Sequence, residues 1–129
     1  MSVRHFTSKD ATFFQYTDLQ IFVGDVLDSS NSETMSVGFY RNMKKGDRNE
    51  WVVSYDEALI VTKGVLTVRF ADGEKTAKPG EIIFITRGTP IAYEAAEDNT
   101  EAVFVTYPHW MDAATKSEYA HLLDSYHPV

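Results

Sequence analysis

The sequence predicts an all-β domain that ends in a helix. Short apolar segments follow one another at intervals of about 8–12 residues, separated by turn-forming residues. Aromatic residues make up 13% of the chain and hydrophobic residues 43%, which suits strands packed around a core. No helical period interrupts these segments until the C-terminus is reached. Regular short strands without intervening helices are typical of a sandwich or a barrel.

Each strand is expected where an apolar or alternating run lies between turn signals. The expected strands are 12–17, 19–27, 35–42, 57–62, 65–70, 81–85, 90–95 and 101–107. Beyond them, Tyr119, Leu122 and Tyr126 recur at helical spacing, and Thr115 with Glu118 forms a capping-box pattern. We therefore predict one domain over residues 1–129. Its barrel spans roughly 12–108 and an amphipathic helix spans roughly 113–126.

Composition excludes several classes of function. Twelve basic residues against nineteen acidic residues give a net charge of −7, which disfavours nucleic acid and anionic membranes as partners. The chain has no cysteine, so thiolate catalysis, disulfides and zinc–sulfur sites are excluded. The start, "MSVRHFTSKDATFF", has no apolar signal region, and the expected location is the cytoplasm.

Two motifs resemble those of the cupin superfamily. Glu57, followed after six residues by Gly64, is similar to the end of the first cupin motif. The segment "PGEIIFITRG" resembles the second motif, with Gly80 and Gly88 in place and Thr86 where proline is usual. The resemblance implies a jelly-roll barrel, in agreement with the strand pattern.

Within the cupins, the chain resembles the EutQ family of ethanolamine-utilisation proteins. The similar stretches run from about Glu50 to Trp110 and include "AKPGEIIFITRGTPI" and "VFVTYPHW". The resemblance implies a role in a catabolic pathway linked to microcompartments, and an acetate-kinase-type activity has been attributed to the family. The sequence contains no recognisable phosphate-binding loop, and we do not expect the kinase activity.

The histidines that usually bind the cupin metal are absent. Counting back from Glu57, they are expected at Glu50 and Val52, or at Trp51 and Val53, and the third is expected at Ile91. Imidazoles supply most of the affinity of such sites for a transition metal. We expect no metal cofactor, and a metal held by Glu50, Glu57 and His109 is the alternative.

The candidate catalytic residues are Glu57 and Tyr93. Glu57 precedes Leu59 and Val61 at the period of a strand, so its side chain is expected to point into the barrel. Burial raises the pKa of a carboxyl, as a general acid or base at neutral pH requires. Tyr93 follows the lost histidine position by two residues and is expected on the same face, near Glu57. A purely structural glutamate is the alternative.

Other residues are candidates for substrate binding. Tyr55 and Tyr107 would supply phenols, Trp51 a wall of the pocket, and Glu50 a second acidic group. Arg41 would bind an anion, and His109 would reach the barrel mouth from the end of the last strand. Arg87 is expected on the solvated surface.

Three functions are compatible with these residues. The first is an enzyme that acts on a small organic metabolite with Glu57 and a tyrosine in acid–base roles. The second is a metabolite-binding or assembly protein without turnover, and the third is a metal enzyme with carboxylate ligands. The resemblance to cupins also implies a homodimer formed through edge strands.

Overall fold

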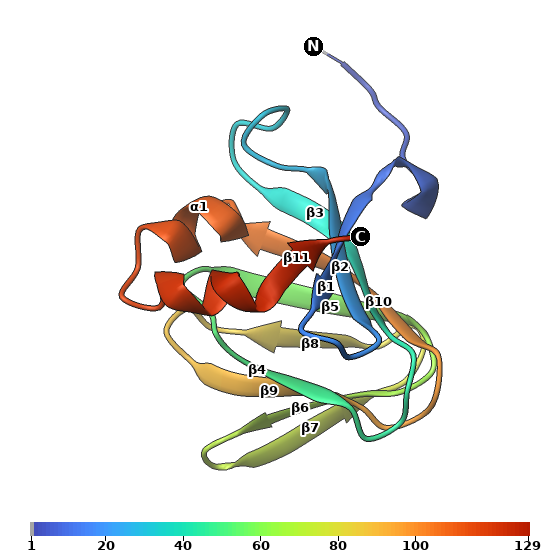
Figure 1. Cartoon of the computed structure of the whole chain (residues 1–129). Helices are drawn as coiled ribbons and strands as arrows, with labels where there is room; N and C mark the ends of the chain where they lie inside the picture. Colours follow the sequence, from blue (N-terminus) through green and yellow to red (C-terminus); the bar gives the residue numbers. More distant parts are fainter. Residues whose placement is uncertain (1) are drawn as a thin grey trace.

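The computed structural model describes residues 2–129 and shows two antiparallel β-sheets packed face to face (Figure 1). The larger sheet has the order β11-β1-β2-β3-β10-β5-β8 and the smaller one β4-β9-β6-β7. The strands of the larger sheet are β1 (Thr12–Tyr16), β2 (Ile21–Leu27), β3 (Ser36–Asn42), β5 (Asp56–Lys63), β8 (Ile82–Ile85), β10 (Thr100–Tyr107) and β11 (Tyr126–Pro128). The strands of the smaller sheet are β4 (Arg48–Val52), β6 (Leu66–Phe70), β7 (Gly73–Ala77) and β9 (Pro90–Ala95). The predicted all-β fold is confirmed.

Alternation along the strands places the core between the two sheets. In β5, Glu57, Leu59 and Val61 are buried, while the residues between them are half-buried. β10 lies between β3 and β5 and pairs with both of them. The apolar faces of these central strands meet those of β4, β6 and β9, which form one hydrophobic cluster. Glu57 therefore occupies a core position.

Gly64 shows why the end of the first motif requires glycine. It joins β5 to β6 with a φ of +70°, in the left-handed region that side chains disfavour. A Cβ atom there would lie 2.5 Å from Oγ1 of Thr100, and this hydroxyl also accepts a hydrogen bond from the amide of Val65. The glycine thus lets β10 pass close to the turn.

The predicted helix over 113–126 is wrong. Instead, a short helix α1 (Trp110–Thr115) is followed by a 3₁₀ helix η2 (Ala120–Ser125) and by strand β11. The hydroxyl of Thr115 donates to the carbonyl of Met111, and that of Ser117 donates to the carbonyl of Ala114. The first bond lies within α1 and the second is at its C-terminal end, so Thr115 is the last residue of a helix rather than the cap at the start of one.

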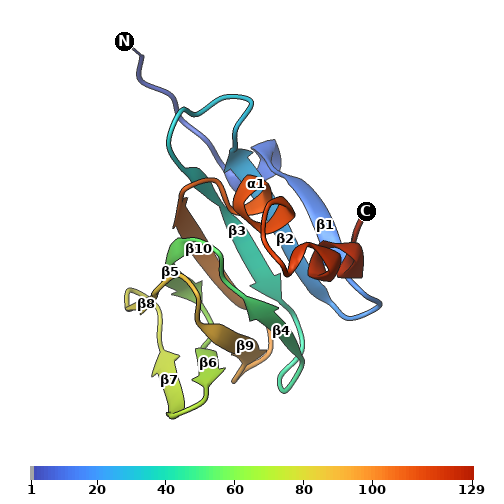
Figure 2. The same cartoon turned by 90° about the vertical axis from the view of Figure 1, so that its left-hand side faces the viewer.

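Residues 110–128, the C-terminal segment, lie across one side of the two sheets. Figure 1 shows α1 and η2 at one side of the sheets, and Figure 2, seen from that side, shows them in front of β1 and β2. The indole of Trp110 donates to the Asp25 carboxylate of β2, and its amide donates to the Ser36 hydroxyl of β3. At the other end of the segment, β11 pairs with β1, opposite Tyr16.

Within residues 2–129, no helix has the length and apolar character needed to span a membrane. A further 3₁₀ turn, η1 (Ser8–Asp10), precedes β1.

Candidate active site

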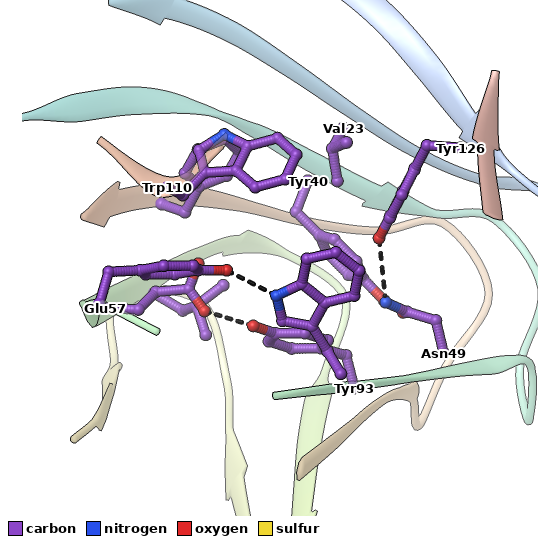
Figure 3. A pocket seen from close by; sticks show the side chains of 11 residues that line it. Val23, Tyr40, Asn49, Glu57, Tyr93, Trp110 and Tyr126 are labelled. Atoms are coloured by element: carbon purple, nitrogen blue, oxygen red, sulfur yellow. Dashed lines mark hydrogen bonds between the residues drawn. The ribbon is translucent and has the colours of Figure 1, made fainter. Parts of the chain in front are cut away.

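Glu57 is the acidic residue at the centre of the site. Only 5% of Glu57 is exposed, and it lies on β5 among the apolar residues of the inner face. Its Oε1 atom accepts a hydrogen bond of 2.5 Å from the hydroxyl of Tyr93, which comes from β9 in the opposite sheet. The sequence predicted that these two side chains point inward and face one another, and the structure confirms that geometry (Figure 3).

Glu57 and Tyr93 line a cavity between the sheets. Its walls are mostly aromatic and apolar side chains, and Glu57 is the one carboxylate among them. The lining residues are Val23, Tyr40, Asn49, Trp51, Tyr55, Glu57, Leu59, Tyr93, Phe104, Trp110 and Tyr126. The space open to the centre of a water-sized sphere is about 30 Å³, room for about two water molecules.

The C-terminal segment closes this cavity. Figure 3 shows Trp110 and Tyr126 on one side of it and Glu57 with Tyr93 on the other. The rings of Trp51, Trp110 and Tyr126 contact each other edge to face, with centroids 5.7–6.4 Å apart. Trp110 and Tyr126 are thus the part of the cavity wall that the C-terminal segment supplies.

Hydrogen bonds hold the polar groups of the cavity in fixed orientations. The indole of Trp51 donates to the Tyr55 hydroxyl at 2.7 Å. The amide nitrogen of Asn49 donates to the Tyr126 hydroxyl at 3.2 Å, and its oxygen accepts from Tyr40 at 3.3 Å. Asn49 thus ties β11 to β4 and β3. In contrast, the hydrogen bonds of the described residues engage only Oε1 of the Glu57 carboxyl, not Oε2.

Burial dominates the proton affinities in the cavity. It raises the pKa of Glu57 to about 7, although the bond from Tyr93 acts in the opposite direction. Burial likewise raises the pKa of Tyr93 and of Tyr55 well above the usual value, and the nearby Glu57 raises both further. Glu57 therefore exchanges its proton near neutral pH, while the phenols remain protonated.

A second, larger space lies on the outer side of Trp110. This groove has a volume of about 240 Å³ on the same measure, and Trp110 and Val23 separate it from the cavity. It is lined by Thr12, Phe14, Val23, Asp25, Asp28, Ser29, Ser36, His109, Trp110, Met111 and Asp112. Burial raises the pKa of Asp25 to about 6, and the bond from Trp110 lowers it in part.

Several residues predicted from the sequence lie outside the cavity. The side chain of Glu50 is 75% exposed on the outer face of β4, and Tyr107 is 58% exposed. Arg41 pairs with Glu101 and lies over the ring of Phe13. All three residues lie on strands, as predicted, but they do not line the cavity. Glu50 and Arg41 alternate with the buried residues of their strands, because a strand shows alternate residues to opposite faces.

The remaining predicted residues are close to the expected positions. Trp51 and Tyr55 line the cavity. His109 lines the outer groove, where its Nε2 atom lies 2.7 Å from the carbonyl oxygen of Ser32. Arg87 is on the surface, as expected, near Asp56.

Sequence reasoning missed Tyr40, Asn49, Trp110 and Tyr126 as cavity residues, and Asp25 in the groove. Asn49 was recoverable, because it shares the face of Trp51 at a spacing of two residues. Trp110 and Tyr126 could not be predicted as cavity residues, since their position depends on the path of the chain after β10.

The usual cupin metal position does not fit a metal in this chain. At the expected histidine positions, Trp51 of β4 and Val53 of the turn after it are buried, and Trp51 pairs with Ile91 of β9. These three side chains stand where imidazoles would be, and they offer no metal-binding lone pair. Of the usual ligands only Glu57 is present. Within residues 2–129, no three His, Asp or Glu side chains are grouped as metal ligands would be.

The comparisons with known proteins agree with this fold. The model of the family described as "Ethanolamine utilisation protein EutQ" matches residues 9–112. The chain belongs to the EutQ family. A solved EutQ protein from Clostridium difficile is 26% identical with a TM-score of 0.67, covering 79% of this chain and 71% of that one. A cupin superfamily protein from Desulfitobacterium hafniense DCB-2, 12% identical with a TM-score of 0.60, covers 73% of this chain and 82% of its own and shares the fold. The predicted cupin jelly roll is thereby confirmed.

A curated relative in the family carries the name of an enzyme. "Acetate kinase EutQ" of Clostridioides difficile (strain 630) is 38% identical over 60 residues, which are 46% of this chain and 37% of the relative. The chain therefore matches little more than a third of the relative's length.

Proposed function

We propose that this EutQ-family cupin binds a small organic metabolite in the cavity between its sheets and exchanges a proton with it through Glu57. One observation carries the proposal: Glu57, which is 5% exposed, lines a mostly aromatic and apolar cavity, and one oxygen of its carboxyl group accepts a hydrogen bond from Tyr93. A charge in such surroundings is costly without a partner, and a bound ligand would supply one.

The pKa of Glu57 suits proton exchange at neutral pH. A group with a pKa of about 7 is present in both protonation states there, so it accepts and returns protons with similar ease. Tyr93 keeps its proton and fixes Oε1, which leaves Oε2 to meet the ligand. If Oε2 removes a proton from one atom of the ligand and returns it to another, the reaction is balanced without a co-reactant.

We infer that a metabolite enters the cavity when the C-terminal segment moves. The cavity holds about two water molecules in the closed arrangement, and Trp110 and Tyr126 form its wall on the side of that segment. Movement of these two rings would admit a metabolite and then exclude water again when they return. Exclusion of water strengthens the electrostatic contacts of a buried carboxyl.

The test is a thermal-shift screen with a metabolite library, followed by turnover assays with each stabilising compound. In the Glu57→Gln variant the side chain keeps its shape and an oxygen that accepts from Tyr93. We expect this variant to lose turnover by about 100-fold or more, the usual effect of removing a general acid or base, and to remain folded. Glu50→Gln removes the same charge from the outer face of β4 and serves as the control. Unchanged turnover in Glu57→Gln would remove Glu57 from the mechanism.

A binding protein without turnover is the second candidate. It is favoured by the loss of the metal ligands at Trp51, Val53 and Ile91, which leaves Glu57 and Tyr93 as the hydrogen-bonded ionisable pair of the cavity. In that case the same screen finds a stabilising metabolite that the protein does not convert.

Acetate kinase activity, the name of the relative from Clostridioides difficile, is not what the site favours. Neither Lys nor Arg is among the described residues that line the cavity or the outer groove, and a phosphoryl group is usually held by such cations. We therefore propose metabolite binding rather than phosphoryl transfer. Formation of acetyl phosphate from acetate and ATP by the purified chain would contradict this choice.

A further inference from the structure

We propose that the ligand of the cavity is a small organic ammonium ion, which reaches the cavity through the outer groove and past Trp110. This inference rests on the proposed function, because it assigns a chemical class to the metabolite bound near Glu57. It is carried by three features of the described residues: the sign of the charges along the route, the aromatic wall, and the position of Trp110 between the two spaces.

The charges along the route are nearly all negative. Asp25, Asp28 and Asp112 line the outer groove, and Glu57 lines the cavity behind it. Among the described residues of both linings, His109 is the one basic side chain, and its Nε2 atom is engaged with the Ser32 carbonyl. Carboxylates that line a cleft with low-dielectric walls concentrate cations and repel anions. An anionic metabolite would therefore meet repulsion both in the groove and beside Glu57.

The cavity wall offers aromatic rings to a positive charge. Trp51, Trp110 and Tyr126 meet at one side, and Tyr40 lies 5.7 Å from Tyr93 between ring centroids at another. The faces of such rings attract organic cations, and the attraction is strongest where water is excluded. Glu57 adds a negatively charged group, which an aromatic cage alone lacks. Glu57 lines the cavity, is 5% exposed, and has Tyr93 rather than a cation as its side-chain partner among the described residues.

Trp110 separates the groove from the cavity. It lines both spaces, and its indole nitrogen lies 2.8 Å from the nearer oxygen of Asp25 on the groove side. An ammonium group in the groove would compete with the indole for the Asp25 carboxylate. Loss of that hydrogen bond would free Trp110 to turn, which would open the cavity to the ligand that caused the loss.

The two tryptophans make a direct test possible, because the chain has only two and both line the cavity. In ¹⁵N-labelled protein, the indole N–H signals of Trp51 and Trp110 report binding there. The probes are propylammonium, 1-propanol and propionate, which share a three-carbon chain and differ in charge. At pH 8 we expect propylammonium to shift both signals and to bind about tenfold or more tightly than 1-propanol, as a desolvated cation–aromatic contact predicts. Propionate is expected to cause no shift.

Glu57→Gln and the control Glu50→Gln locate the charge that selects the cation. Glu57→Gln should reduce propylammonium affinity about tenfold or more and leave that of 1-propanol unchanged, whereas Glu50→Gln should change neither.

In the wild type, affinity for propylammonium should also fall about tenfold between pH 8 and pH 6, because protonation of Glu57 competes with the cation. Asp25, which faces the groove, protonates in the same range and acts in the same direction. The titratable groups that face Glu57 are the phenols of Tyr40, Tyr55, Tyr93 and Tyr126, and burial keeps all four protonated throughout.

The outcomes separate this inference from the proposed function. Equal binding of all three probes, or preferred binding of propionate, would overturn the ammonium inference and leave a metabolite-binding cavity in place. If no probe shifts either indole signal while the library screen finds a neutral or anionic ligand, the inference is also overturned. If neither the probes nor the library bind, both proposals fail.

Discussion

Glu57 is costly to the folded protein, and this cost is what makes it a candidate for function. Its carboxyl is surrounded by the aromatic and apolar side chains of the cavity and receives one hydrogen bond, from Tyr93. A leucine at this position of β5 would suit the alternation that Leu59 and Val61 continue. Retaining an ionisable group where an apolar one would be more stable is typical of sites that bind or react.

The pKa of Glu57 predicts how stability depends on pH. Burial raises this pKa from 4.5 to about 7, so over that range the folded chain holds a proton that the unfolded chain has lost. The stabilisation is complete below the unfolded pKa and is lost as the pH rises through the folded pKa. Each pH unit removes up to about 1.4 kcal/mol of unfolding free energy, or about 3 kcal/mol in total. Asp25, raised from 3.8 to about 6, adds a loss of the same sign at slightly lower pH.

Urea denaturation at pH 4.5 and pH 8 tests this linkage. We expect Glu57→Gln to be more stable than the wild type at pH 8 by about 2–3 kcal/mol, because the neutral amide has no charge to desolvate. At pH 4.5 the two proteins should be nearly equal. Glu50→Gln, on the solvated face of β4, should leave the pH dependence unchanged. A wild type equally stable at both pH values would show that Glu57 is not buried as a strongly perturbed acid.

The sequence predicted the strands better than it predicted the structure of the C-terminal segment. Alternation in β5 and β9 placed Glu57 and Tyr93 on inner faces, since each strand has a buried side with a period of two. The segment after β10 has tyrosines and leucines at helical spacing, but α1 ends at Thr115, and the hydroxyl of Ser117 donates to the carbonyl of Ala114 at that end. Tyr126 then joins a strand through pairing with β1. Such pairing depends on partners distant in sequence, which a local period does not report.

Tyr126 is one of the two aromatic residues of the C-terminal segment that line the cavity. Its ring contacts Trp51, Trp110 and Tyr16, with centroids 5.4–6.4 Å away, and its hydroxyl accepts from Asn49. We expect Tyr126→Ala to destabilise the protein by about 2–4 kcal/mol, somewhat less than the usual cost of removing a fully buried aromatic ring, because Tyr126 is partly buried. It should also shift the tryptophan fluorescence to longer wavelength, because both indoles would become hydrated.

Tyr126→Phe is the matched variant, because it keeps the ring and removes only the hydroxyl. Its cost should be about 1 kcal/mol, with little change in fluorescence, since one hydrogen bond from Asn49 is lost. If Tyr126→Ala leaves both stability and fluorescence unchanged, β11 does not close the cavity in solution.

At the scale of the whole molecule, the two sheets leave one apolar edge uncovered within residues 2–129. β8 is the last strand of the larger sheet, and its outward side chains Ile82 and Phe84 are 64% and 63% exposed. An edge strand with exposed apolar residues pairs readily with another chain unless charge or a covering element prevents it. The net charge of −7 opposes unspecific association, but a single symmetric contact at β8 would bury these residues.

The homodimer predicted from the resemblance to cupins is therefore expected to form through β8. Size-exclusion chromatography with light scattering should give twice the mass of one chain for the wild type. Phe84→Lys should give the mass of a single chain, because a paired edge would bring two copies of the new charge together in a buried contact. Met35→Lys is the control, since Met35 is an exposed apolar residue at the start of β3, far along the sheet order from β8. A wild type that elutes with the mass of one chain at every concentration would contradict the homodimer. If Phe84→Lys still gives twice the mass of one chain, the dimer interface lies at another edge.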